Sequence, residues 1–243
     1  MSAGTDDSIA LRGAGLVSIY QTKKGFRFTL DSLLLADFCR IKSRDRVLEP
    51  GAGTGIISIV LAKKFPSARF VADEIEPQLC NLLRRNVERN GLVDAITTIE
   101  RDLRYLRRSM APETFDAIVA NPPYVKQGTG KISPSSERQS ARHDQAAPLT
   151  AWLNLQCLLK NKGRYFLVFP ASRAAELLSL LRENNLEPKR LRSVHPFADK
   201  PASLLLIESV KRAGIGLEIM PPLIVHEADG RYADEMREIY GAS

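Results

Sequence analysis

The sequence of 243 residues predicts an α/β protein with a mostly parallel sheet and helices on both faces. Short apolar runs alternate with helix-like stretches along most of the chain, as in proteins whose strands and helices alternate. The run "GRYFLVFP" is almost continuously apolar, which is typical of a parallel strand buried on both faces. A hydrophobic fraction of 44% and a charged fraction of 26% are ordinary for a globular protein. One large domain covering residues 1–243 is therefore expected rather than two.

The individual elements follow from these patterns in chain order. Residues 15–28 are expected to form a hairpin with its turn at "KKG", and the first eight residues are expected to be disordered. Pro77 and Gly91 mark the start and end of one helix. The fourth strand is expected beside the third. The expected strands are residues 46–50, 68–75, 95–100, 115–120, 163–170, 188–197 and 202–210, and the expected helices are residues 29–41, 56–65, 77–91, 148–160, 172–185 and 230–240. Residues 125–146 form a long polar loop.

Composition also limits the functional classes. A net charge of +7 suits a polyanionic partner such as RNA, although it fits a simply solvated basic surface almost as well. The three cysteines lack metal-ligand spacing and indicate small core residues in a reducing cytoplasm. The three histidines are isolated from one another, so no metal site is expected. No apolar run reaches the length of a membrane span. The oligomeric state, monomer or dimer, stays open.

A glycine-rich loop, "EPGAGTG" at residues 49–55, joins the first strand of the sheet to its helix. Gly51, Gly53 and Gly55 allow a tight turn and a close approach of a ligand to the backbone. The loop is neither a G-x-G-x-x-G motif nor a P-loop. Glu49 would repel phosphates, so the ligand is expected to carry positive charge and no phosphate.

Two further acids follow the next two strands. Glu74 comes 19 residues after Gly55, close to the spacing expected of an acid that binds ribose hydroxyls, and Asp102 follows the third strand. Ligands of such sheets bind where strands end. Three carboxylates there suit S-adenosylmethionine, which combines a nucleoside with a cationic tail. Each acid alone is equally compatible with a helix cap, and Asp73 is an alternative to Glu74 as the ribose ligand.

The tetrapeptide "NPPY" at residues 121–124 ends the fourth strand. The side-chain oxygen of Asn121 and the carbonyl of Pro122 can accept both hydrogens of a planar amino group. Pro122 and Pro123 would hold these acceptors rigidly. Tyr124 offers a face on which a flipped base can stack. The expected chemistry is methylation of an amino or amide nitrogen, and the alternative is a proline-rich turn without catalytic use.

The motifs "LEPGAGTG", "EIEP", "RDL" and "NPPY" resemble, in this order, those of class I S-adenosylmethionine-dependent methyltransferases. The segments "GFRFTLDSLLLADF", "RRNVERNGL", "ARHDQAAPLTAWL" and "PPLIVHEADGRYADEMREIYG" are similar to those of the bacterial family that methylates the N6 atom of an adenosine beside the anticodon of a valine tRNA. The resemblance covers roughly residues 15–241. It implies a Rossmann-like, seven-stranded sheet whose last strand is antiparallel, with S-adenosyl-L-methionine as cofactor.

The resemblance also implies roles for individual residues. Asn121, Pro122, Pro123 and Tyr124 would hold the target base. Phe28 and Asp31 match a segment that closes over the cofactor in relatives. The chain departs from the pattern at Glu49 and Pro50, where many relatives have Asp and Leu, and at Asp73, where an apolar residue is usual. The implied cofactor ligands are Phe28, Asp31, Glu49, Gly51, Ala52, Gly53, Gly55, Glu74, Ile75, Asp102, Leu103 and Asn121.

Cations near this site are candidates for contact with RNA phosphates. Lys23, Lys24 and Arg27 precede the first helix, and Lys126, Lys131, Arg138 and Arg142 lie in the loop after "NPPY". Arg84, Arg85 and Arg89 are expected on an exposed helix face instead, and the role of "LRYLRRSM" stays open. Competing functions are a protein glutamine N5-methyltransferase of the release-factor type, a methyltransferase for ribosomal RNA or DNA, and a non-catalytic RNA-binding protein.

Overall fold

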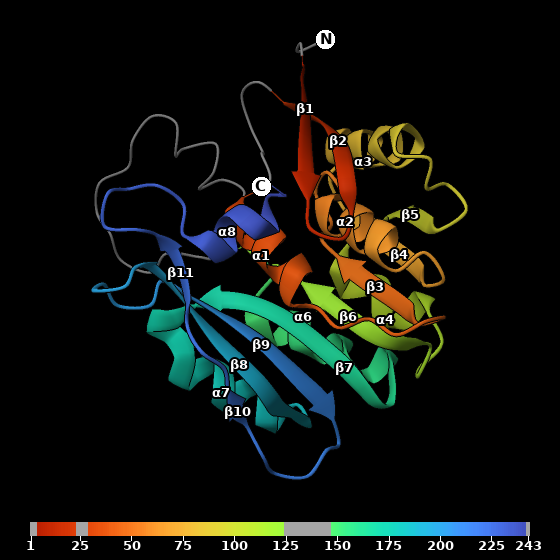
Figure 1. Ribbon diagram of the computed structural model, residues 1–243. Helices are drawn as coiled ribbons and strands as arrows, with labels where there is room; N and C mark the ends of the chain where they lie inside the picture. The colour runs from red at the N-terminus through yellow and green to blue at the C-terminus, as the bar shows by residue number, and fades with distance from the viewer. Residues whose placement is uncertain (1–3, 23–28, 124–146, 242–243) are drawn as a thin grey trace, which may run out of the picture.

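The computed structural model describes residues 4–22, 29–123 and 147–241 (Figure 1). Within these residues, nine strands form one sheet and two form a separate hairpin. The strands are β1 (Gly4–Leu11), β2 (Gly15–Thr22), β3 (Arg46–Pro50), β4 (Arg69–Glu74), β5 (Ile96–Glu100), β6 (Phe115–Ala120), β7 (Leu159–Pro170), β8 (Leu186–Phe197), β9 (Leu204–Lys211), β10 (Glu218–Ile219) and β11 (Leu223–His226). The helices are α1 (Leu30–Phe38), α2 (Ile56–Lys64), α3 (Pro77–Arg89), α4 (Leu103–Ser109), α6 (Leu149–Leu153), α7 (Ala174–Glu183) and α8 (Asp234–Ile239), with 3₁₀ turns η1 (Asn154–Leu158) and η2 (Ala171–Arg173).

The sheet confirms the predicted architecture. Its strand order is β10-β8-β9-β7-β6-β3-β4-β5, and all pairs are parallel except those that β9 makes with β7 and β8. Seven of these strands are the expected Rossmann-like set, and the last of them along the chain, β9, is antiparallel. The sequence predicted neither a strand nor a helix for the residues of β10 and β11. These two short strands extend the sheet by pairing with β8.

The position of β6 differs from the prediction. This fourth parallel strand pairs with β3 and β7, so the expectation that it lies beside the third strand is wrong. From β3 the chain builds outward through β4 and β5, and then returns to add β6 on the other side of β3. The order of strands therefore reverses between β3 and β6, where open α/β sheets bind ligands. Val47 pairs with Ala117 and Leu48 with Ile118, which places the ends of β3 and β6 next to each other.

The N-terminal hairpin also differs from the prediction. β2 pairs with β1, and the turn spans residues 12–14, which is a hairpin that the sequence did not predict. Residues 4–11 are a strand rather than disordered, and the "KKG" segment lies outside the described residues. Asn86 and Asn90 on α3 hold β2 in place. The Asn86 amide accepts from Tyr20 N at 2.7 Å and donates to Tyr20 O at 3.2 Å, and Asn90 makes the same pair of bonds with Ser18.

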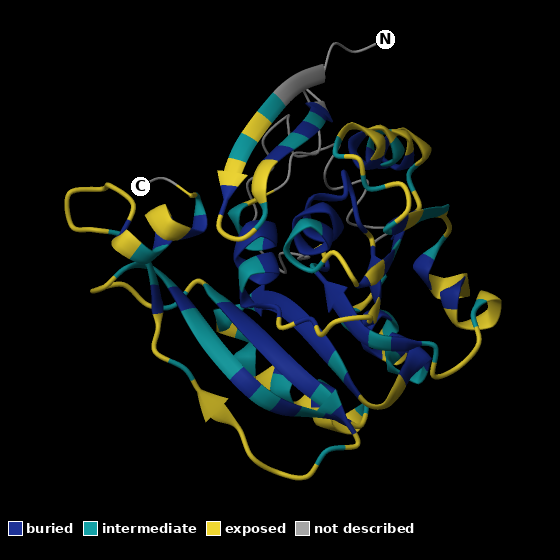
Figure 2. Cartoon of the chain, turned by 45° about the vertical axis from the view of Figure 1, so that its right-hand side comes forward, coloured by how far each residue is buried: buried dark blue, intermediate teal, exposed yellow. Residues whose placement is uncertain are grey.

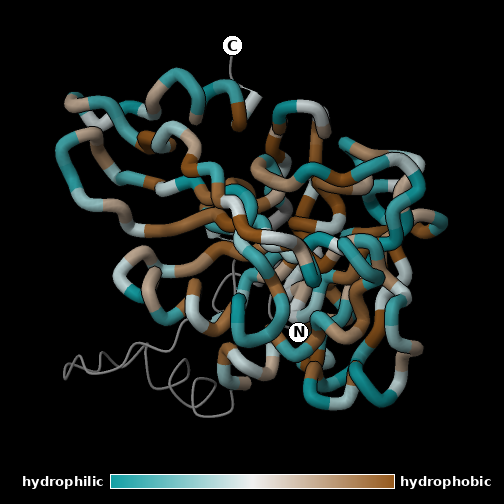
Figure 3. The backbone as a smooth tube through the Cα atoms, turned by 90° about the horizontal axis from the view of Figure 1, so that it is seen from below, coloured by the Kyte–Doolittle hydropathy of each residue, from teal (hydrophilic) through white to brown (hydrophobic). Residues whose placement is uncertain are grey.

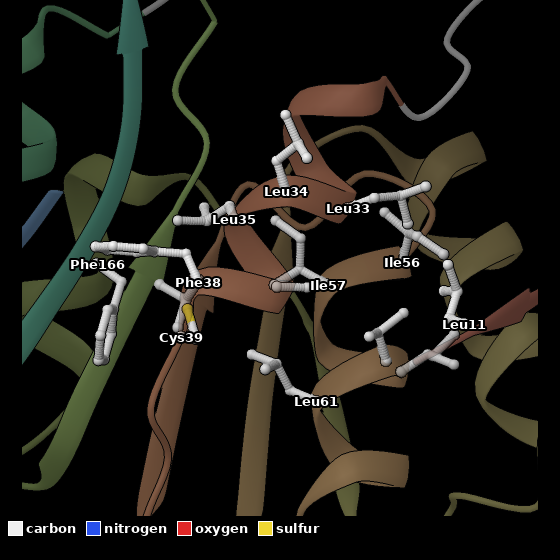
Figure 4. Packing of buried hydrophobic residues seen from close by; sticks show 14 of the residues in the cluster. Leu11, Leu33, Leu34, Leu35, Phe38, Cys39, Ile56, Ile57, Leu61 and Phe166 are labelled. Carbon is white, nitrogen blue, oxygen red and sulfur yellow. The ribbon is translucent and has the colours of Figure 1, made fainter. Parts of the chain in front are cut away.

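Two apolar cores lie on the two faces of the sheet. One packs α1 and α2 against the sheet, and the other packs α4, α6 and α7 against it. Figure 4 shows Leu34, Leu35 and Phe38 of α1 among Ile57 and Leu61 of α2. The inner strands are buried and hydrophobic, whereas the outer side of α3 and the loops are exposed and mostly polar (Figures 2 and 3). Because α1 is buried almost all round, its position in the fold is tightly fixed.

The helix expected over residues 148–160 is shorter than predicted. α6 ends at Leu153 and continues as the turn η1, and β7 begins at Leu159. The Tyr165 hydroxyl in β7 donates to the carbonyl of Trp152, which ties the end of α6 to the sheet. A run of buried leucines fits a helix and a strand equally well, so periodicity alone does not locate this boundary.

Candidate active site

Three neighbouring strands end in a group of carboxyl side chains. Glu49 ends the apolar part of β3, while Asp73 and Glu74 end β4. Their exposed fractions are 3%, 1% and 6%. Asp102 follows β5 and is the N-cap of α4. Glu49, Asp73 and Glu74 are therefore buried acids, which proteins rarely retain without a partner for their charge.

The glycine loop takes the conformation that the sequence predicts. Gly51 and Gly55 have φ angles of 62° and 85°, in the left-handed region that favours glycine. A Cβ atom on Gly51 would lie 2.6 Å from the Trp152 ring, and one on Gly55 would lie 2.3 Å from Leu83 Cδ1. Trp152 and Leu83 thus support the loop from opposite sides, and no larger residue fits at either glycine.

Glu49 binds the first turn of α2. Its Oε2 accepts a hydrogen bond from Ser58 N at 2.9 Å and a shorter one from Ser58 Oγ. Burial is the main reason that the pKa of Glu49 rises to about 8. The nearby charge of Glu74 adds to this rise, whereas the hydrogen bonds from Ser58 oppose it. Glu49 is therefore both a helix-capping group and a carboxyl that a nearby cation would ionise.

Glu74 joins the ends of β4 and the glycine loop. Its Oε2 accepts from Gly53 N at 2.8 Å and its Oε1 accepts from Glu76 N at 2.9 Å. Burial raises the pKa of Glu74 in spite of these bonds. Both carboxylate oxygens thus accept a hydrogen bond from the backbone. Each keeps a second lone pair, to which a ribose hydroxyl can donate.

Asp102 is held by Arg104. Asp102 Oδ1 accepts from Arg104 N at 2.8 Å, and the guanidinium of Arg104 spans both carboxylate oxygens. The bond from Arg104 keeps the pKa of Asp102 below its usual value. The next residue, Leu103, is buried, while Ile75 after β4 is 55% exposed. Asp102 is therefore an ionised, oriented acceptor, and the clamp by Arg104 had not been foreseen from the sequence.

Asp73 differs from the other acids because one of its carboxyl oxygens is buried without a hydrogen-bond partner among the described residues. Its Oδ1 is buried and accepts no hydrogen bond within the described residues. Burial, with help from the charges of Glu74 and Asp102, raises its pKa to about 8, and Arg101 offsets only part of this. Adjacent strand residues face opposite sides of a sheet, so Asp73 points away from the side that Glu74 faces. Glu74, whose carboxylate reaches the glycine loop, is the better ribose candidate of the two.

Replacing Asp73 with asparagine is expected to change how stability depends on pH. The folded pKa lies above the unfolded value of 3.8, so stability is greatest below pH 4 and falls as pH rises through about 8. The loss is on the order of 1 kcal/mol per pH unit. Denaturant melts from pH 5 to 8.5 should show a flatter decline in stability for Asp73→Asn, with the residual slope due to Glu49 and Glu74, whose pKa values are also raised. The exposed Asp94→Asn control should match the unmutated protein, and an unchanged slope for Asp73→Asn would show that this carboxyl ionises freely.

Asn121 lies directly after β6, beside the end of β3. Its Nδ2 donates to Ser32 Oγ at 3.0 Å, and Ser32 is a buried residue of α1. This bond fixes the amide plane and directs Oδ1 away from Ser32. Pro122 is buried and Pro123 is exposed, so the chain leaves the core between them. An oriented amide oxygen on a proline-restrained backbone is a suitable acceptor for an amino group.

The remaining candidates divide into described and undescribed residues. Asp31 lies in the first turn of α1, where burial raises its pKa, and Ala52 is buried with its N–H donated to Asp73 O at 2.7 Å. Arg85 and Arg89 lie over the Tyr20 ring and Arg84 pairs with Glu100, so these arginines do form an outer helix face. The candidates outside the described residues are Lys23, Lys24, Arg27, Phe28, Tyr124, Lys126, Lys131, Arg138 and Arg142.

Sequence reasoning missed three supporting residues. Ser32 orients Asn121, Trp152 supports Gly51, and Asn86 donates to the Thr54 carbonyl of the glycine loop at 2.9 Å. Each acts across 30 to 100 residues of sequence. The only local signal was the polar character of Ser32 and Asn86 at core positions of their helices.

The donor set fits S-adenosylmethionine. The carboxyls of Glu49 and Glu74 are buried at the ends of neighbouring strands, and the pKa of each is raised, so a cationic ligand is favoured and a phosphate is disfavoured. The left-handed glycines bring the backbone close to a ligand. In the described residues, no group of three or more possible metal ligands occurs. Nor does any helix in these ranges have the length and apolar character for a membrane crossing.

The fold and this site define a class I S-adenosylmethionine-dependent methyltransferase. Residues 27–136 match the family described as "Methyltransferase small domain". The chain belongs to the tRNA1(Val) (adenine(37)-N6)-methyltransferase family. A member from Porphyromonas gingivalis is 30% identical over 89% of this chain and 88% of its own, and one from Vibrio campbellii is 28% identical over 91% and 90%.

Solved structures agree on the fold. A protein from Agrobacterium tumefaciens, described as a predicted O-methyltransferase, has a TM-score of 0.70 at 18% identity and covers 88% of this chain and 96% of its own. A precorrin-6y C5,15-methyltransferase from Geobacter metallireducens has a TM-score of 0.54 at 15% identity, over 80% and 94%. At these identities the likeness shows the shared architecture alone.

Proposed function

We propose that this methyltransferase transfers a methyl group to the N6 amino group of an adenine in tRNA, near the anticodon. The observation that carries the proposal is the Asn121 amide, which is fixed by Ser32 at the point where β6 ends beside the carboxyl-lined site. The relatives named above act, by their names, on adenine 37 of a valine tRNA.

The residues divide the task of holding the cofactor. Glu74 would accept from the ribose hydroxyls, Asp102 and Leu103 would bind the adenine, and Glu49 with the glycine loop would face the methionine end. The remaining proposed cofactor ligands are Phe28, Asp31, Ala52, Ile75 and Asn121. When bound, S-adenosylmethionine supplies an electrophilic methyl group carried on a sulfonium. The carboxyls that surround the site favour this positive charge.

The tetrapeptide that follows β6 would prepare the acceptor. The amino nitrogen of adenine is a weak nucleophile because its lone pair is delocalised into the ring. Asn121 Oδ1 and the Pro122 carbonyl would each accept one of its hydrogens and favour a pyramidal nitrogen, while Tyr124 would stack on the base. Once the nitrogen is methylated its proton is acidic and passes to water, so no strong general base is needed.

Ser32 is expected to act on the rate through Asn121. Ser32→Ala removes a hydrogen bond that orients the amide, and kcat should fall about tenfold while cofactor affinity is unchanged. A double-mutant cycle measures this: in an Asn121→Ala background, Ser32→Ala should cost nothing further. If the losses in kcat from Ser32→Ala and Asn121→Ala added in full, Ser32 would support the fold rather than the orientation of Asn121.

RNA contacts and organisation complete the proposal. Seven cations would contact phosphates around the target base, namely Lys23, Lys24, Arg27, Lys126, Lys131, Arg138 and Arg142.

Residues 1–243 would form one methyltransferase domain, in which residues 1–28 are an N-terminal extension and residues 125–146 a substrate loop. The bonds from Asn86 and Asn90 to β2 support the assignment of the hairpin to this domain. A cytoplasmic location follows from a tRNA substrate.

Methyl transfer from tritiated S-adenosylmethionine to bulk tRNA, ribosomal RNA, DNA and total protein tests the proposal. Label recovered from tRNA as N6-methyladenosine is the expected result. Label in protein as methylglutamine would favour the glutamine N5-methyltransferase, which faces the same problem of a delocalised nitrogen. Label in ribosomal RNA or DNA would keep the chemistry and change the substrate. Cofactor binding without transfer to any of the four would favour a non-catalytic RNA-binding role.

A further inference from the structure

The outer face of α4 carries an unusual set of side chains. Leu103 and Leu106 are buried and anchor the helix to the sheet, whereas the opposite side faces solvent. The segment "RDLRYLRR" contains four arginines and one aspartate. Spacings of three and four residues place arginines and a tyrosine on one side of a helix. We call this side the α4 surface, and it consists of Arg101, Arg104, Tyr105, Arg107 and Arg108.

Two of these arginines, Arg107 and Arg108, lack a side-chain partner among the described residues. Arg104 is held by Asp102, but neither Arg107 nor Arg108 forms an ion pair, side-chain hydrogen bond or ring contact in the described residues. The Tyr105 ring is 55% exposed, and within the same ranges it makes no ring contact. By contrast, Arg164, Arg190 and Arg192 each bind a carboxylate.

The α4 surface begins at the cofactor site. Arg101 N donates to Glu74 O at 3.3 Å, and Asp102 caps the first turn of α4. With about 1.5 Å of rise per residue, Arg108 lies within roughly 10 Å of Asp102 along the helix. In the described part of the chain, β5 is the edge strand of the sheet (Figure 1).

We propose that the α4 surface binds the RNA substrate outside the reaction site, with Arg107 and Arg108 on phosphates and Tyr105 stacked on an unpaired base. This inference rests on the proposed function. Unpaired cations gain affinity by releasing counterions from a nucleic acid. An exposed ring among arginines favours a single-stranded RNA segment over an acidic peptide, because bases stack on such rings and carboxylates do not.

The test is the binding of fluorescently labelled tRNA by anisotropy across a salt series. In Arg107→Gln/Arg108→Gln, affinity should fall at least tenfold at low salt, and the slope of log affinity against log salt should decrease by about 1.5. KM for tRNA should rise in parallel, while calorimetry should give an unchanged cofactor affinity. Tyr105→Ala should weaken binding about tenfold, and Tyr105→Phe should restore it.

A matched control removes the same charge elsewhere. Arg40 and Arg44 precede β3 at the opposite end of the strands and form no side-chain contact within the described part of the chain. Arg40→Gln/Arg44→Gln should keep the tRNA affinity and the salt slope. An equal loss in this control would assign the effect to net charge and overturn the proposal. So would unchanged tRNA binding in the α4 variants.

Two outcomes separate this inference from the proposed function. If the unmutated protein neither binds nor methylates tRNA, the proposed function fails. If it methylates tRNA and the α4 variants do so with the same KM, only the α4 surface is refuted. Polyglutamate serves as a probe for a general anion site. One combined result would overturn the proposed stacking of Tyr105 on an RNA base. In it, the arginine variants lose polyglutamate binding, and Tyr105→Ala leaves the tRNA affinity unchanged.

Discussion

Asn121→Ala is expected to lower kcat by about 10²–10³-fold, as when an enzyme loses one preorganised polar group that acts in the transition state. Cofactor affinity should fall much less than kcat, because the glycine loop and Glu74 are held by their own bonds and remain in place. The Nδ2 bond to Ser32 directs Oδ1 away from α1, so alanine removes an oriented acceptor without opening a large cavity. Single-turnover methyl transfer and calorimetry measure the two quantities separately.

Asn81→Ala is the matched control for this prediction. Asn81 is exposed on α3 and accepts a hydrogen bond from Arg84, so its loss should leave both rate and affinity unchanged. If Asn121→Ala lost rate and cofactor affinity equally, Asn121 would be a structural support of the cofactor site. An unchanged rate would leave the Pro122 carbonyl as the only acceptor that matters.

Local patterns in the sequence predicted the parts of the fold that depend on near neighbours. The glycine loop, the three strand-end acids and the Pro77 helix start each follow from residues within a few positions of one another. The strand order does not. β6 pairs with β3 rather than β5 because packing between distant segments selects the partner, and no residue in "FDAIVA" encodes that choice.

The pairing of β2 with β1 also depends on distant residues. Both "KKG" and the "RGAG" that joins β1 to β2 contain turn residues, and the polar strand "GTDDSIAL" lacks the apolar pattern of a buried strand. The choice between them is made by Asn86 and Asn90, which bind the edge of β2 from 66 to 72 residues away. Isolated two-stranded hairpins are only marginally stable, so this docking decides the register.

The candidate site shows the same division between local and distant information. Sequence spacing predicted Glu49, Glu74, Asp102 and Asn121 as site residues. The proposed chemistry calls for carboxylates and an amide at these positions. Their orientation comes from Ser58, the backbone of Gly53, Arg104 and Ser32, respectively. Only Arg104 lies within three residues of its acid. A carboxylate or amide can thus be predicted from a motif, whereas the group that orients it is supplied by the tertiary fold.

Glu74→Gln is expected to weaken cofactor binding about 100-fold, although the substitution is nearly isosteric. Both oxygens of Glu74 accept backbone N–H bonds, from Gly53 and from Glu76. A glutamine amide has only one oxygen, so its NH₂ group must face one of these donors. A buried donor without an acceptor costs about 1–3 kcal/mol, and the glycine loop would move to relieve it. The substitution also removes the negative charge that, in the proposed role of Glu74, would favour the ribose hydroxyls and the sulfonium.

Calorimetric titration with S-adenosylmethionine, together with thermal melts, checks this expectation. The midpoint of thermal unfolding should also fall, because the bond between β4 and the glycine loop is part of the fold. Glu100→Gln is the control, since Glu100 is an exposed acid at the end of β5 whose only ion pair is with Arg84 among the described residues. If Glu74→Gln kept full cofactor affinity, the ribose would have to be bound elsewhere. Asp73 would then be the residue to mutate next, because it is the other acid at the end of β4.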